Sequence, residues 1–161
     1  MMARDAKPHV KWDDEAGVAA NARSELPKLA QAFFAEVREV LAGNPRLARL
    51  HPLRVSGKRL RYSLDLFRPC YDAGLEERIE ALKQVQDLLG QVNDLVASVA
   101  LIRKSMRPSR LRTQVERFAG RRAAEKAKAF REHWGREFDA PGREEWWTGY
   151  LAREAHAPER K

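Results

Sequence analysis

A row of basic side chains occupies one face of residues 51–67 (HPLRVSGKRLRYSLDLF), a segment whose apolar spacing predicts a helix. At about 100° per residue, four of these side chains fall together, opposite the apolar stripe: His51, Arg54, Lys58 and Arg61. Like charges one turn apart destabilise a helix, and Asp65 is the only acidic residue in the segment. Guanidinium and ammonium groups grip phosphate oxygens, so the row predicts binding of a polyanion.

The positive charge of the chain is concentrated in two segments. The 161 residues have a net charge of +8. Residues 43–68 hold seven basic side chains and one acidic, residues 107–136 hold ten basic and three acidic, and each remaining segment is slightly acidic. If the two segments lie side by side, they create a positive field suited to a polyanion. The alternative for each segment is an ordinary solvated helix face.

The whole sequence reads as helical, with glycine and proline at a few separating points. We expect helices over about 24–41, 45–67, 75–104 and 110–138, with Ser24 as the first N-cap and Pro27 in the first turn. A shorter amphipathic helix containing Trp146 and Trp147 follows residue 142. The predicted fold is all-α, an antiparallel four-helix bundle with a short extra C-terminal helix. The predicted organisation is a partly disordered extension (1–22), the bundle (23–140), and the short helix with its tail (141–161).

Polar residues interrupt two of the predicted apolar faces. Gln86 and Asn93 lie seven residues apart on the third helix, where each needs a buried partner. They are predicted either to bridge helices or to orient the cations. On the fourth helix, the face begun by Leu111, Val115 and Phe118 continues with Arg122, Lys126 and His133. A cation facing the interior is costly unless it is paired or binds an anion.

Several classes of function are disfavoured. No carboxylate cluster suits Mg²⁺, no phosphate-binding glycine loop occurs, and no His/Cys set has zinc spacing, so we expect a binding module without metal or cofactor, not an enzyme. No apolar run reaches the roughly 18–20 residues of a membrane span. The N-terminus lacks the apolar stretch of a signal peptide, and the single cysteine, Cys70, is expected to be a packing residue in a reducing cytoplasm.

The basic segment, together with LKQVQDLLGQVNDL at residues 82–95, resembles the CHAD family, the conserved histidine α-helical domain. The resemblance is strongest over residues 51–102. The matching positions are His51, Arg54, Lys58, Arg59, Leu60, Arg61 and Tyr62, followed by Gln86, Gly90, Asn93 and Asp94. The resemblance implies a helical bundle whose basic surface binds inorganic polyphosphate without catalysis. Some members of the family lie on polyphosphate granules, which implies a cytoplasmic location for this chain.

Carried over to this chain, the resemblance implies a defined set of site residues. The expected polyphosphate-binding residues are His51, Arg54, Lys58, Arg59, Arg61, Arg122 and Lys126, supported by Tyr62, Gln86 and Asn93. A full CHAD domain has two such repeats, whereas this chain has one. We therefore predict a homodimer whose two basic surfaces form one groove. The Trp146–Trp147 segment would serve that contact, or would pack on its own bundle.

Two other partners remain open at this stage. The high pI alone suggests nucleic acid, although the basic face lacks rows of aromatic side chains on which bases stack. A scaffold for acidic protein partners is the third alternative. Protonation of the His51 ring adds a positive charge, so binding of a polyanion should strengthen as the pH falls toward about 6.

Overall fold

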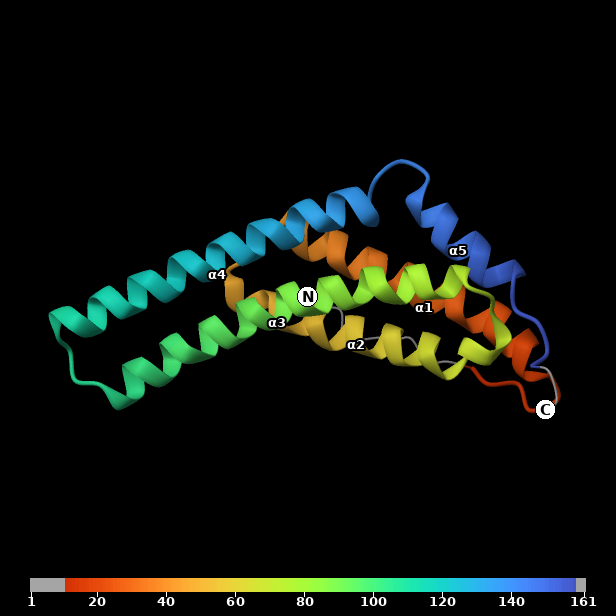
Figure 1. Ribbon diagram of the computed structural model, residues 1–161, viewed down its shortest axis with the longest axis horizontal. Helices are drawn as coiled ribbons and strands as arrows, with labels where there is room; N and C mark the ends of the chain where they lie inside the picture. The colour runs from red at the N-terminus through yellow and green to blue at the C-terminus, as the bar shows by residue number, and fades with distance from the viewer. Residues whose placement is uncertain (1–10, 159–161) are drawn as a thin grey trace, which may run out of the picture.

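The computed structural model describes residues 11–158, and every regular element within that range is a helix (Figure 1). The all-α class predicted from the sequence is therefore confirmed. In chain order the elements are α1 (Val18–Ala42), the 3₁₀ helix η1 (Leu47–Leu50), α2 (His51–Leu66), the 3₁₀ helix η2 (Arg68–Cys70), α3 (Gly74–Ser105), α4 (Arg110–Glu137) and α5 (Arg143–Arg153). In this part of the chain no helix is both long and apolar enough to cross a membrane.

The first helix begins six residues before the predicted N-cap. The side chain of Asn21 donates to the carbonyl oxygens of Asp13, Ala16 and Gly17, and accepts from the backbone N–H of Asp13, so it holds the chain entering the helix. Ser24 lies inside the helix, where its hydroxyl donates to Glu25. Residues 18–22 consequently belong to the packed body and not to an extension. Residues 1–10 of the predicted extension lie outside the described range.

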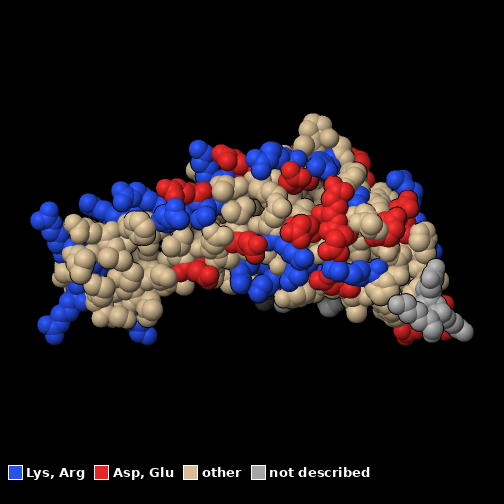
Figure 2. Space-filling view, in the orientation of Figure 1, with Lys and Arg blue, Asp and Glu red and all other residues tan. Residues whose placement is uncertain are grey.

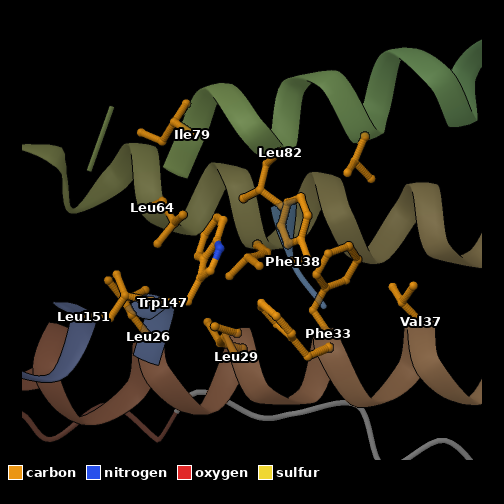
Figure 3. Close-up of a cluster of buried hydrophobic side chains, with 14 of the residues drawn as sticks. Leu26, Leu29, Phe33, Val37, Leu64, Ile79, Leu82, Phe138, Trp147 and Leu151 are labelled. Carbon is orange, nitrogen blue, oxygen red and sulfur yellow. The ribbon is translucent and has the colours of Figure 1, made fainter. Parts of the chain in front are cut away.

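The core lies where α1, α2, α3 and the end of α4 meet α5. α1 packs on α2 and α5, and α3 packs on α2 and α4. Figure 3 shows apolar side chains of α1 pointing toward Leu64 of α2, Leu82 of α3 and the ring of Phe138. An aromatic cluster closes this end of the molecule, with ring centroids 4.6 Å apart for Trp134 and Phe138 and 5.2 Å apart for Phe138 and Trp147. The buried Cys70 belongs to the same core, as predicted.

α5 is fastened to its own bundle by aromatic side chains and one buried cation. Trp147 is fully buried in the core, so the Trp146–Trp147 segment has the packing role. Arg78 of α3, 3% exposed, donates to the carbonyl oxygens of Gly74 and Trp146. Its guanidinium lies 3.5 Å from the ring centroid of Trp146 and 3.8 Å from that of Tyr150. Burial lowers the pKa of Arg78 to about 10, which leaves it charged at neutral pH.

α3 and α4 form an antiparallel hairpin that projects beyond the other helices (Figure 1). The last buried side chain of α3 is Val92, and the first of α4 is Ala119. Beyond these positions Val96 is half-buried and Ala100 is exposed. A four-helix bundle over the full helix lengths is therefore not what the chain forms. We call the projecting part, residues 93–118, the arm.

The buried face of α4 differs from the predicted one. Its centre consists of Ala119, Ala123, Ala127, Phe130 and Trp134. Leu111 and Phe118 are 60% and 59% exposed, and Arg122 is exposed as well. The prediction that Arg122 faces the interior is wrong, because the buried face of α4 runs through the three alanines to Phe130 and Trp134, while Arg122 is exposed on the same side as Leu111 and Phe118. Lys126 is half-buried at the edge of this contact, and His133 is buried, as expected.

Candidate functional site

The basic face of α2 lies along α3 and contacts it at three successive positions along the helix. We call the side chains of His51, Arg54, Lys58, Arg59 and Arg61 the α2 face. His51 is the first residue of α2, directly after η1 and before Pro52. Its ring nitrogen Nδ1 lies 2.8 Å from Oδ1 of Asn93 on α3. Because an amide oxygen only accepts, Nδ1 carries the hydrogen and Nε2 is left for a ligand.

The second position is the contact between Arg54 and Gly90. The Nε atom of Arg54 is buried and has no hydrogen-bond partner. It lies 3.6 Å from the point where a Cβ on Gly90 would stand, so the absence of a side chain there leaves room for the guanidinium. Buried N–H groups are almost always paired, and an unpaired one in a native site calls for a missing acceptor. The Arg54 donor is thus suited to an incoming anionic oxygen.

The third position is that of Gln86, which is buried between α2 and α3. Its Nε2 donates to the carbonyl oxygen of Gly57 at 3.0 Å, and its Oε1 accepts from Nε of Arg61 at 3.0 Å. A Cβ at Gly57 would meet the ring of Phe33 on α1 at 3.4 Å, so this glycine serves the packing of α2 against α1. Gln86 and Asn93 therefore both bridge the helices, as the sequence predicted, and both hold a cationic side chain in place.

Most of the α2 face has no compensating acid. Arg61 lies 3.6 Å from Asp65, which also pairs with Arg68 at 2.8 Å. The Arg61 guanidinium is 4.7 Å from the ring centroid of Tyr62. By contrast Arg54, Lys58 and Arg59 form no ion pair within residues 11–158. The α2 face is thus an array of largely unpaired positive charges, of which Arg61 is held by Gln86.

Arg122 does not join this array. It pairs with Glu125 at 3.2 Å on α4, a helix that packs mainly on α3. Arg131 bonds Asn44 in the connection that leads to η1 and α2. Arg122 is nine residues earlier, which places it about 180° around the helix, on the side away from that connection. Lys126 is half-buried and forms no ion pair in the described chain. The predicted contribution of α4 to the site therefore lacks support from the geometry.

Two glycines are essential to the site but were not among its predicted residues. Gly90 leaves the space in which Arg54 lies against α3, and Gly57 brings α2 close to Phe33 of α1 while its carbonyl oxygen accepts from Gln86. The sequence could have indicated both positions, because each is a glycine within a helical pattern. Glycine there costs roughly 1 kcal/mol of helix stability relative to alanine, so its presence indicates a close packing contact.

A leucine at position 90 is expected to weaken anion binding while leaving the fold intact. The larger side chain would occupy the space of the Arg54 guanidinium, which lies at the surface and can move. A reduction of about tenfold in affinity corresponds to the loss of one charged hydrogen bond of roughly 1.5 kcal/mol. Titration of polyphosphate into Gly90→Leu would measure the change, with Gly90→Ala as the control because a Cβ alone makes an ordinary contact. Equal affinity of both variants and wild type would contradict the role of Gly90.

A groove of about 300 Å³ opens beside His51 and Asn93, at the foot of the arm. Its walls come from η1 and α3 and are mainly apolar, with Leu50, Leu89 and Val92 among them. Such a lining does not suit a polyphosphate. Within residues 11–158, no three His, Cys, Asp or Glu side chains lie together in a way that would hold a metal ion.

Comparison with known families gives one result. The model of the CHAD domain matches residues 3–103, which extends well before the segment of strongest resemblance and ends within α3. The match includes the whole of the α2 face and the three α3 residues in contact with it, Gln86, Gly90 and Asn93. It leaves out α4 and α5. No curated protein and no solved structure shows significant similarity to the chain.

Proposed function

Because this chain belongs to the CHAD family, we propose that it binds inorganic polyphosphate on the α2 face and acts as a binding module without catalytic activity. The observation that carries the proposal is the row of unpaired cations on α2, held from α3 and including the buried, unpaired Nε of Arg54. Binding in the cytoplasm, including at polyphosphate granules, and a regulatory role in phosphate metabolism are both compatible with such a module.

The ligand fits the array in charge and in shape. From His51 to Arg61 the α2 face rises about 15 Å at roughly 1.5 Å per residue. Polyphosphate is a linear anion with negative charge on every repeating unit and no bases to recognise. Arginine binds phosphate oxygens as a fixed fork and lysine binds them as a point charge. Release of counterions should dominate the affinity, so that binding weakens steeply with added salt.

Nucleic acid is the second candidate. Its basis is the net charge of +8 and the exposed ring of Tyr62, which is 55% exposed beside Arg61. One aromatic ring supports stacking of one base, whereas single-strand binders use several in succession. An acidic protein partner is the third candidate and predicts weak binding that does not depend on polyphosphate length.

A competition experiment tests the proposal. Labelled long-chain polyphosphate would be bound at about 0.15 M salt, where exposed charges are already screened beyond about 8 Å. Single- and double-stranded DNA at equal phosphate concentration would then compete. We expect DNA to displace the label poorly. Equal displacement by DNA would instead assign the α2 face to general polyanion binding, and a failure of polyphosphate to bind would exclude the proposal.

A further inference from the structure

The α3–α4 hairpin has an apolar face that no other described element covers. Half-buried or exposed apolar side chains recur along it at intervals of three, four and seven residues. We call them the hairpin face: Leu95 and Ile102 on α3, with Leu111, Val115 and Phe118 on α4. Figure 2, in the same view as Figure 1, shows a broad uncharged surface over the projecting arm, with basic side chains along its borders.

The hairpin face is separate from both the core and the α2 face. On α3, Gln86 and Asn93 are directed toward α2. At about 100° per residue, Leu95 lies about 160–180° around the helix from them. Figure 1 shows α3 and α4 in front of α1 and α2, so the viewer sees this outer side of the hairpin. The hairpin face is thus the side of the molecule that the body leaves uncovered.

Within the arm the centre of the hairpin face is uncharged, whereas beyond the arm the face on α4 continues with the exposed Arg122, which pairs with Glu125. Neutral side chains border the apolar row, namely Gln91 and Ser98 on α3 and Gln114 on α4, and all three are exposed. An anionic lipid or nucleic-acid partner would favour basic residues at these positions. A row of apolar side chains with neutral polar neighbours is instead typical of contact with another protein surface.

The two edges of the hairpin face carry opposite charges. Beyond the neutral row, the edge on α3 carries Asp87 and Asp94, and the edge on α4 carries Arg121 and Lys128. Asp87, Asp94 and Arg121 form no ion pair within residues 11–158. The contacts His133–Ala81 and Arg103–Glu116 fix the register of the two helices. In that register Asp94 lies level with residues 120–125 of α4, and Asp87 lies level with residues 127–132.

We propose that the hairpin face binds a second copy of this chain, about a twofold axis that runs along the hairpin. This axis places α3 of each copy antiparallel on α4 of the other and keeps residues at the same level along the hairpin. Asp94 of one copy then meets Arg121 of the other, and Asp87 meets Lys128. The perpendicular twofold axis would place α3 on α3 and α4 on α4, bringing like charges together, which is destabilising. Charge complementarity therefore selects the first arrangement.

The available area is sufficient for a stable pair. A stretch of about 20 residues on two adjacent helices measures about 30 Å by about 20 Å. This gives on the order of 600 Å² per copy, or about 1,200 Å² in total, at the lower end of specific interfaces. The resulting dimer leaves both α2 faces in solvent. It therefore differs from the dimer expected from the sequence, in which the basic surfaces form one groove.

Analytical ultracentrifugation of the full chain tests this inference without any polyphosphate, so its outcome is independent of the proposed function. We expect a reversible dimer, and Phe118→Glu should raise its dissociation constant at least tenfold. Leu66→Glu is the matched control, because Leu66 is 74% exposed at the end of α2, outside the hairpin. Asp94→Arg and Arg121→Asp should each weaken the dimer, and the two changes in one chain should restore it.

Three results would overturn the inference. The first is a wild-type chain that stays monomeric at about 200 μM, well above the concentration at which a micromolar interface is filled. The second is an equal effect of Phe118→Glu and Leu66→Glu. The third is a monomer that instead binds vesicles of anionic lipid in a manner that depends on Phe118. Circular dichroism of each variant would verify folding, which is expected because the substituted side chains are exposed.

Discussion

Replacement of both Arg54 and Lys58 by alanine should weaken the binding of long-chain polyphosphate by about a hundredfold or more. Each side chain offers a charged hydrogen bond worth roughly 1.5–3 kcal/mol, and neither has an ion pair within the described chain that would reduce its availability. Arg54 contributes a buried, unpaired Nε, and Lys58 lies one turn further along the same face. Isothermal titration at constant salt would measure the loss.

A control with equal loss of charge separates this site from general attraction. Arg107 and Arg117 are exposed cations at or near the far end of the arm, and they form no ion pair within residues 11–158. Arg107→Ala/Arg117→Ala should change the affinity less than about threefold, because exposed charges farther than a Debye length of about 8 Å are screened. If both double variants lose the same affinity, the net charge of the protein and not the α2 face accounts for binding.

Trp147→Ala should lower the free energy of unfolding by about 3–5 kcal/mol, the usual loss when a buried tryptophan or phenylalanine is truncated. The indole is fully buried, and its ring centroid lies 5.2 Å from that of Phe138 and 6.1 Å from that of Phe34. Its removal would leave a cavity where α5 meets α1 and the end of α4. Urea denaturation followed by circular dichroism would measure the change.

Trp12→Ala is the matched control for that measurement. Trp12 also stacks on a phenylalanine, with ring centroids 5.8 Å apart from Phe67, but it is 48% exposed. Its truncation creates no closed cavity, so the expected loss is below about 1.5 kcal/mol. Similar destabilisation by both variants would show that α5 adds little to the stability of the body.

The sequence predicted the polar contacts between α2 and α3 well. Gln86 and Asn93 interrupt an apolar face, and a buried amide must find a partner, so their bridging role followed from one helix alone. The positions of Arg54 and Arg61 followed in the same way from the spacing of the apolar stripe on α2. These are local properties, because a helix fixes which side chains share a face.

The face of α4 could not be predicted in that way. Large apolar side chains such as Leu111 and Phe118 usually lie inside, and the interior position of Arg122 was inferred from them. In the structure the buried face of α4 runs through three alanines toward the aromatic cluster, while Leu111 and Phe118 lie where no third helix covers the hairpin. How far a bundle extends along its helices depends on the lengths of all its members, which no single helix reveals. The first residue of α1 was also predicted wrongly. Its N-cap, Gly17, has no side chain that could cap the helix, so the sequence shows no capping residue there.

The arm is held by one helix–helix contact, whereas α3 in the body is packed against both α2 and α4. Segments with few buried contacts open locally at a lower free energy than the rest of the fold. Asn93 stands at the border between the two parts, next to Val92, the last buried residue of α3. When the arm frays to this border, His51 loses its partner, whereas Gln86 still holds Arg61. The α2 face thus has a rigid end and a mobile end, and a bound anion that bridges them would slow the opening of the arm.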